Sequence, residues 1–196
     1  MKKIVSPDTQ RENRVPDGQF LTDKFPVFHY GSTPTIDKTK WIFKIWGLVE
    51  QEVELDFAQF DALPKVELHC DIHCVTTWSK LDTHWVGVQS KELLNLCKPD
   101  PKATHVLVHA WNNWSTNLTL EDFFKDDVVF ATEYEGQPVT ADHGGPVRLV
   151  VPRLYFWKSA KWVTGVQFLS KEVLGFWEKY GYHNHGDPWK EERYGY

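Results

Sequence analysis

The sequence predicts an α+β fold of mixed sheets, in which strands dominate and the helices are short. Segments rich in β-branched and aromatic residues recur between residues 41 and 168, and residues 66–74 alternate apolar and polar side chains. The start and stop signals of helices are confined to three short segments. Strands and helices follow one another without an internal repeat, so we expect one mixed architecture.

Local patterns predict the individual elements. The expected strands span residues 41–49, 66–74, 105–110, 128–134, 147–151 and 161–168, and the expected helices span residues 56–63, 90–97 and 120–125. Asp56 is the candidate N-cap of the first helix and Pro64 stops it, while Ser90 is the candidate N-cap of the second. Pro152 ends the strand at residues 147–151.

We expect residues 36–174 to form one domain, flanked by an arm and a tail. Residues 1–35 are polar and interrupted by prolines, which predicts an extended N-terminal arm. The aromatic run at residues 25–31 indicates that this arm packs on the domain. Residues 175–196 are rich in Trp, Tyr, His and Gly without a clear period, which predicts a tail that wraps the same domain.

Composition excludes several functional classes. The formal net charge of −5 argues against a nucleic-acid binder, which would carry a basic surplus. No apolar run approaches the length of a membrane span, and no secretory signal is evident at the start. The three cysteines are odd in number and predict a reducing compartment, so we expect a cytoplasmic protein. Ten Trp residues suit both a core and a ligand pocket.

The run His69-Cys70-Asp71-Ile72-His73-Cys74 carries four metal-ligating side chains. Cys70 and Cys74 would lie about 13–14 Å apart on a strand, too far to share a zinc ion with bonds of about 2.3 Å. Cys70 is therefore expected to be a small core residue. Cys74 lies where the strand gives way to a polar turn, which places its thiol at the edge of a cavity and leaves a structural and a functional role open.

A second segment, residues 143–152, places a cation in an apolar strand. Arg148 lies two residues into that strand, where a lone charge is costly, so it should meet an anion. The anion is either an Asp or Glu of the protein or a phosphate, which Arg binds bidentately. Ser159 and Lys161 follow in a turn that is either an anion cradle or a solvated loop.

The run His143-Gly144-Gly145-Pro146-Val147-Arg148-Leu149-Val150-Val151-Pro152, followed by Ser159-Ala160-Lys161-Trp162, resembles the molybdopterin-binding domain of the sulfite oxidase family. Residues 71–76 look like the cysteine segment of its small bacterial members. The resemblance covers roughly residues 25–170, and it implies the mixed-sheet fold of that domain.

The resemblance also implies a set of site residues and an activity. Cys74 would be the protein ligand of molybdenum in a molybdenum–molybdopterin cofactor. The residues that match the family's cofactor contacts are Arg148, Ser159 and Lys161 for the phosphate and His143, Phe28 and His29 for the pterin. The implied activity is that of an oxidoreductase that moves an oxygen atom and two electrons on a small substrate, with a separate protein as electron partner.

One departure from the family bears on the substrate. Vertebrate and plant sulfite oxidases carry an Arg shortly after the metal-binding cysteine, whereas residues 75–79 here contain none. A small dianion such as sulfite favours fixed guanidinium groups, so the departure argues against sulfite.

Two other functional classes stay open, a non-catalytic carrier of the molybdenum cofactor and a Cys/His zinc protein. The substrate, the direction of the reaction and the oligomeric state do not follow from the sequence. Conceivable substrate anchors or proton donors are Tyr30, His73, Trp78, Arg153 and Tyr155, and Trp111 and Asn112 are conceivable neighbours of the pocket.

Overall fold

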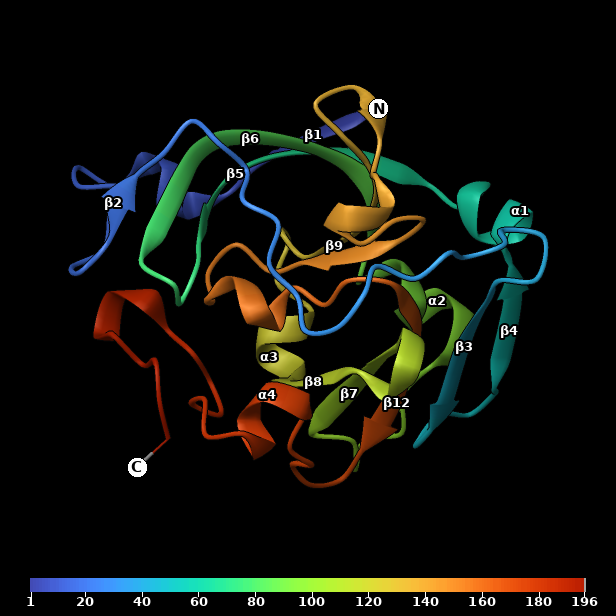
Figure 1. The fold of residues 1–196 in the computed structure, drawn as a ribbon. Helices are drawn as coiled ribbons and strands as arrows, with labels where there is room; N and C mark the ends of the chain where they lie inside the picture. Colours follow the sequence, from blue (N-terminus) through green and yellow to red (C-terminus); the bar gives the residue numbers. More distant parts are fainter. Residues whose placement is uncertain (196) are drawn as a thin grey trace.

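Two mixed β-sheets form the framework of the protein (Figure 1). The structure is a computed structural model that describes residues 1–195. The first sheet contains β1 (Lys2–Val5), β2 (Phe20–Leu21), β5 (Lys65–His73), β6 (Trp78–Gln89), β9 (Val129–Tyr134), β10 (Gln137–Pro138) and β11 (Arg148–Val150). The second contains β3 (Ile42–Gly47), β4 (Val53–Asp56), β7 (His105–Ala110), β8 (Ser115–Thr119) and β12 (Val163–Leu169). The short helices are α1 (Phe57–Asp61), α2 (Glu92–Cys97), α3 (Leu120–Phe123) and α4 (Phe176–Lys179).

Each sheet combines parallel and antiparallel pairs. The first has the order β1-β5-β6-β9-β10, with β11 paired to β9 and β2 paired to β6. The second has the order β4-β3-β12-β7-β8. Strands β1 and β5 are parallel, as are β12 and β3, whereas β5 with β6 and β12 with β7 are antiparallel. The predicted strand-dominated α+β class is confirmed.

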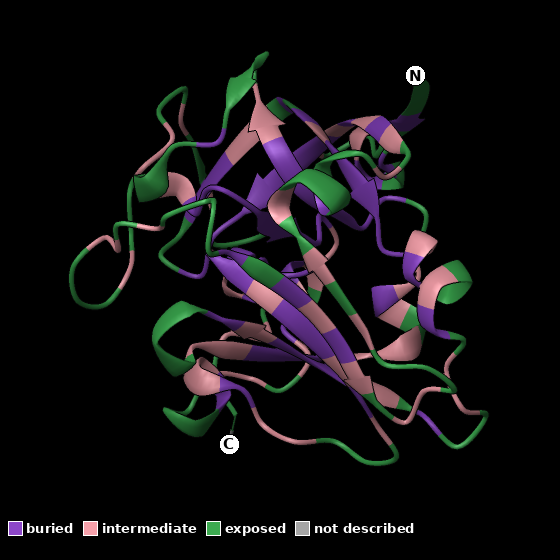
Figure 2. Cartoon of the chain, turned by 90° about the vertical axis from the view of Figure 1, so that its right-hand side faces the viewer, coloured by how far each residue is buried: buried purple, intermediate pink, exposed green. Residues whose placement is uncertain are grey.

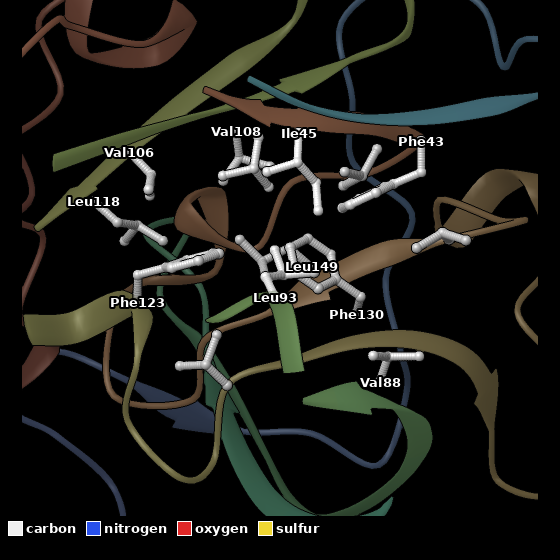
Figure 3. Packing of buried hydrophobic residues seen from close by; sticks show 14 of the residues in the cluster. Phe43, Ile45, Val88, Leu93, Val106, Val108, Leu118, Phe123, Phe130 and Leu149 are labelled. Carbon is white, nitrogen blue, oxygen red and sulfur yellow. The ribbon is translucent and has the colours of Figure 1, made fainter. Parts of the chain in front are cut away.

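The main hydrophobic core lies between the two sheets. Figure 3 shows Phe43 and Ile45 of β3 facing Phe130 of β9 across this interface, and the rings of Phe43 and Phe130 lie 5.2 Å apart. Figure 2 shows buried residues running along the strands and exposed residues concentrated in the connections. Large apolar side chains from both sheets therefore fill one continuous interior.

The helix caps follow the sequence in one case and depart from it in another. Asp56 accepts a hydrogen bond from the backbone of Gln59 and completes a capping box at α1, as its position predicts. The prediction that Ser90 caps the second helix is wrong. Its buried hydroxyl instead donates to the carbonyl oxygen of Phe123, and Lys91 occupies the N-cap position of α2 without a side-chain cap.

The long strand β6 is missing from the sequence-based expectation. The sequence predicts a polar turn over residues 75–79. In the structure the turn ends before Trp78, where β6 begins. Its buried face carries polar side chains, Ser79 and Thr83, which hides the apolar alternation that marks a strand. Thr83 compensates for its burial by donating to the carbonyl of Cys70 on β5.

Both terminal segments join the body. Strand β1 runs parallel to β5, and Ser6 behind it donates to the buried carboxylate of Asp127 at 2.7 Å. In the tail, Glu178 forms a fully buried ion pair with Lys158 at 2.7 Å. The segment expected as an arm thus supplies strands of the first sheet, and the tail is tied to the body by a buried charge pair.

Within residues 1–195, no helix reaches the length and apolar character that crossing a membrane requires.

Replacing Phe130 with Ala should lower the free energy of unfolding by about 3–5 kcal/mol, because it leaves a cavity where the two sheets meet. Urea denaturation followed by circular dichroism measures the change. Phe20→Ala is the matched control, since this ring is 57 % exposed, and its cost should stay within about 0.5 kcal/mol. Equal costs in the two variants would contradict this account of the core.

Candidate functional site

A cavity of about 290 Å³ gathers most of the predicted site residues. Its lining comes from segments far apart in the sequence: Phe25, Pro26, Phe28, His29, Tyr30, Cys74, Val75, Thr76, Trp78, Trp114, Ser115, Arg148, Phe156, Trp157, Ser159, Ala160, Lys161, Trp162, Trp177 and Tyr182. Every predicted cofactor contact except His143 is among them. The volume and the aromatic lining are typical of a small-molecule site.

Cys74 lies immediately after β5, in the turn that leads to β6. The turn is closed by a hydrogen bond from the Cys74 amide to the carbonyl of Trp78 at 2.9 Å. The hydroxyl of Thr76 donates to the Cys74 sulfur at 3.1 Å. Burial raises the pKa of this thiol, and the Thr76 hydrogen bond opposes that effect. A thiol held in this way becomes a stable thiolate when a metal replaces its proton.

Both ends of the chain hold the turn that carries Cys74. Gln19 in the N-terminal segment donates from its side-chain amide to the carbonyl of Cys74 at 3.2 Å. Arg193 in the tail donates to the carbonyl of Val75 at 2.8 Å, and its guanidinium lies 5.0 Å from the ring centre of Tyr155. Segments at opposite ends of the sequence thereby fix the backbone on which the sulfur depends.

Arg148 is 1 % exposed and is bonded only to neutral groups of the protein within residues 1–195. Its guanidinium donates to the carbonyls of His143 at 2.7 Å and Ser159 at 2.9 Å, and lies 4.3 Å from the ring centre of Phe156. Burial lowers the pKa of Arg148 to about 9. The structure thus pairs Arg148 with no Asp or Glu of the described residues, and the alternative of a ligand phosphate stays a prediction.

Lys161 provides a second cation on the same lining. Its ammonium donates to the carbonyl of Asp142 at 2.6 Å and to the ring of His29 at 3.3 Å. Burial and the nearby charge of Arg148 lower the pKa of Lys161 to about 7. A bound anion would reverse this shift, because it favours the charged form of the amine.

His143 lies beside the cavity. Its ring stacks on Phe25 with centroids 3.9 Å apart and planes 9° from parallel. Burial and the charge of Arg148 lower the pKa of His143 to about 4, so the ring is neutral at physiological pH. Its Nδ1 atom is buried and has no hydrogen-bond partner among residues 1–195, which leaves a polar atom free to bond a ligand or a water molecule.

The histidines and cysteines of residues 69–74 do not come together in space to form a metal site. Within residues 1–195, no group of three or more His, Cys, Asp or Glu side chains is placed to hold a metal ion. His69 contacts Asp82, His73 contacts Ser79, and Cys70 is buried against Thr83. The zinc alternative therefore lacks a ligand set in the described part of the chain.

The conceivable anchors divide into two groups. Tyr30 and Trp78 line the cavity. His73, Arg153, Tyr155, Trp111 and Asn112 are not part of its lining. Arg153 instead pairs with Asp127 at 3.1 Å.

Sequence reasoning missed several aromatic residues of the lining: Trp114, Trp157, Trp177 and Tyr182. For Trp177 and Tyr182 the signal was the high density of aromatic residues in the tail, because covering a polar surface does not require so many large rings.

Comparisons with known proteins agree on one family of oxidoreductases. The family model described as "Oxidoreductase molybdopterin binding domain" matches residues 30–177. The chain is 43% identical over 187 residues to the "Uncharacterized oxidoreductase YuiH" of Bacillus subtilis, covering 95% of this chain and 94% of the relative.

More distant relatives carry assigned names. The protein-methionine-sulfoxide reductase catalytic subunit MsrP of Gluconobacter oxydans is 27% identical over 178 residues, covering 79% of this chain and 56% of the relative. MsrP of Campylobacter jejuni is 26% identical over 208 residues, covering 94% of this chain and 67% of the relative. The chain thus spans little more than half of the Gluconobacter protein.

A solved structure shares the fold. The sulfane dehydrogenase SoxCD of Paracoccus pantotrophus matches with a TM-score of 0.68 at 21% identity, covering 74% of this chain and 42% of that chain. This likeness agrees with the mixed-sheet architecture expected from the sequence.

Replacing Thr76 with Val should raise the pKa of the Cys74 thiol further, because the hydroxyl that stabilises the thiolate is lost. Only the thiolate reacts with iodoacetamide, so alkylation of the cofactor-free protein at pH 8 should slow and its pH–rate curve should move to higher pH. Mass spectrometry of the Cys74 peptide measures the rate. Thr77→Val is the control, since that hydroxyl bonds the Thr76 carbonyl instead of the sulfur. An unshifted curve in Thr76→Val would show that the hydroxyl does not stabilise the thiolate.

Proposed function

Because the chain belongs to the family of oxidoreductases with a sulfite-oxidase-type molybdopterin-binding domain, we propose that it catalyses two-electron oxygen-atom transfer on a small substrate, using a molybdenum–molybdopterin cofactor. The observation that carries this proposal is the cavity on which Cys74 and Arg148 both lie. It combines a soft metal-ligating sulfur with a buried cation bonded only to neutral groups.

The residues of the cavity fit such a cofactor. A phosphate-bearing heterocycle needs a cationic region, flat walls and hydrogen-bond donors or acceptors for its ring. Arg148 and Lys161 supply the charge, and Phe28 and Trp162 supply aromatic surface. Beside the cavity, the unpartnered Nδ1 of His143 supplies a free polar atom. The structure adds to the motif that these residues, far apart in the sequence, lie on or beside one cavity.

We assign roles to the chain's own residues on this basis. Cys74 would bind the molybdenum through its sulfur, with Thr76 orienting that sulfur. Arg148, Ser159 and Lys161 would hold the phosphate. The residues proposed to contact the pterin are Phe28, His29 and His143. When bound, the cofactor supplies the two-electron redox chemistry, while the protein orients it and excludes water.

The proposed reaction reduces an uncharged S-oxide: one sulfoxide, two protons and two electrons give one sulfide and one water. The names of the MsrP relatives support this direction, and the absence of an Arg in residues 75–79 argues against sulfite. The electrons would come from a separate protein, which the designation of those relatives as catalytic subunits supports.

We further propose a cytoplasmic location. Cys70, Cys74 and Cys97 are all free thiols, which suits a reducing compartment. Cell fractionation with an antibody against the chain tests this location.

Cys74→Ser should preserve the fold but abolish turnover, because a hydroxyl is a poor ligand for a metal that favours soft sulfur. The measurements are molybdenum content by elemental analysis, circular dichroism, and the oxidation of reduced benzyl viologen by methyl phenyl sulfoxide. Cys70→Ala is the control and should remain active, since Cys70 is a core residue away from the cavity lining. Full activity in Cys74→Ser would remove Cys74 from the metal. Wild-type protein that holds molybdenum but never turns over would favour the carrier alternative.

Arg148→Gln should weaken cofactor retention, because a charged hydrogen bond to the phosphate contributes about 1.5–3 kcal/mol, or roughly 10- to 150-fold in affinity. Molybdenum per chain after gel filtration measures retention. Thermal unfolding of the cofactor-free variant controls for the lost bonds to the His143 and Ser159 carbonyls. Retention equal to that of the wild type would show that Arg148 is a structural residue.

A further inference from the structure

Four aromatic residues form a continuous wall of the cavity that the proposed cofactor contacts do not use. We name Trp114, Trp157, Trp177 and Tyr182 the aromatic wall. Ring centroids lie 5.6 Å apart between Trp114 and Trp177, 5.3 Å between Trp177 and Tyr182, and 5.0 Å between Tyr182 and Trp157. Spacings of this size are ordinary contact distances between rings, so the wall is preformed.

The aromatic wall carries no formal charge. Among residues 1–195, the Lys and Arg side chains that line the cavity are Arg148 and Lys161, and the proposed function assigns both to the cofactor phosphate. No Asp or Glu of the described residues belongs to the lining. A small oxyanion on the aromatic wall would thus lose its hydration without gaining a cation of its own, whereas an uncharged, polarisable sulfur group gains contacts with the ring faces.

Tyr182 is the member of the wall that carries a hydroxyl, and its ring is held in place from both sides. Its ring is stacked between Trp157 and Tyr194, with interplanar angles of 22° on both sides. Its amide donates to the carbonyl of Trp177 at 3.1 Å, and its backbone bridges to that of Tyr194. The ring therefore cannot turn away without breaking the structure of the tail.

The Tyr182 hydroxyl is suited to donate a hydrogen bond. Burial, the neighbouring Tyr194 and the charge of Cys74 raise the pKa of Tyr182, so the hydroxyl keeps its proton at physiological pH. Tyr182 and Cys74 both line the same cavity. Two other hydroxyls of the lining are less suited to this role, because the Thr76 hydroxyl already donates to the Cys74 sulfur and Tyr30 is 71 % exposed.

We propose that the aromatic wall is the substrate subsite, which takes an uncharged S-oxide with alkyl or aryl substituents, and that the Tyr182 hydroxyl donates a hydrogen bond to the oxide oxygen. This inference rests on the proposed function. The S–O bond breaks, the sulfur gains two electrons from a reduced donor protein or dye, and two protons from solvent convert the oxygen to water.

The test compares Tyr182→Phe with the matched control Tyr180→Phe in the molybdenum-loaded enzyme. Tyr180 belongs to the same tail, but it is 74 % exposed and lies outside the cavity lining. With methyl phenyl sulfoxide and reduced benzyl viologen, Tyr182→Phe should lower kcat/KM roughly 3- to 10-fold, the effect of one neutral hydrogen bond. Tyr180→Phe should leave it unchanged, and molybdenum content should match the wild type in both variants.

A second variant separates the ring contacts from the hydroxyl. Trp177→Leu should raise KM for methyl phenyl sulfoxide more than KM for dimethyl sulfoxide, because the smaller probe has no aryl group to place on the wall. Quenching of tryptophan fluorescence by the product, methyl phenyl sulfide, gives an independent measure of binding. The concentration of methyl phenyl sulfide that gives half-maximal quenching should rise in the same variant.

The outcomes distinguish the inference from the proposed function. Faster turnover of sulfite than of either sulfoxide, or equal kcat/KM in wild type and Tyr182→Phe, would overturn the inference and leave oxygen-atom transfer intact. A molybdenum-loaded enzyme that turns over neither sulfite nor the sulfoxides would overturn both.

Discussion

The guanidinium of Arg148 is a buried charge that the described chain surrounds with carbonyls and aromatic rings instead of carboxylates. Burying a cation in this way destabilises the protein unless an anion compensates. The fold nevertheless retains it, and the same burial lowers the pKa values of Lys161 and His143 nearby. On the proposed function, these residues form half of an ion pair whose other half would be the cofactor phosphate.

The position of the Cys74 sulfur depends on residues from the whole length of the chain. Gln19 and Arg193, at opposite ends of the sequence, both bond carbonyls of the turn that carries it. The buried pair of Lys158 and Glu178 fixes the tail from which Arg193 extends. Breaking such a pair by removing one partner is strongly destabilising, so the tail contributes to the geometry of the site as well as to its surface.

The sequence predicted those parts of the protein that depend on local pattern and charge. The alternation of β5, the cap at Asp56 and the exceptional burial of Arg148 follow from single segments. Strand β6 escaped prediction because Ser79 and Thr83 point inward and are satisfied by partners that local sequence does not reveal. Hydrogen bonds to distant parts of the chain allow polar side chains at buried positions of such strands, so the alternation of apolar and polar residues is lost.

The aromatic wall escaped prediction for a different reason. Trp114 precedes β8, Trp157 follows β11, and Trp177 and Tyr182 belong to the tail, so no local motif connects them. The family motif identifies the residues that would hold the cofactor, since every member must bind the same group. Substrate contacts have no such common partner and arise from the particular way this tail folds back on the body. On the proposal made above, rings and a hydroxyl in place of free guanidinium groups would make this part of the cavity selective for uncharged molecules.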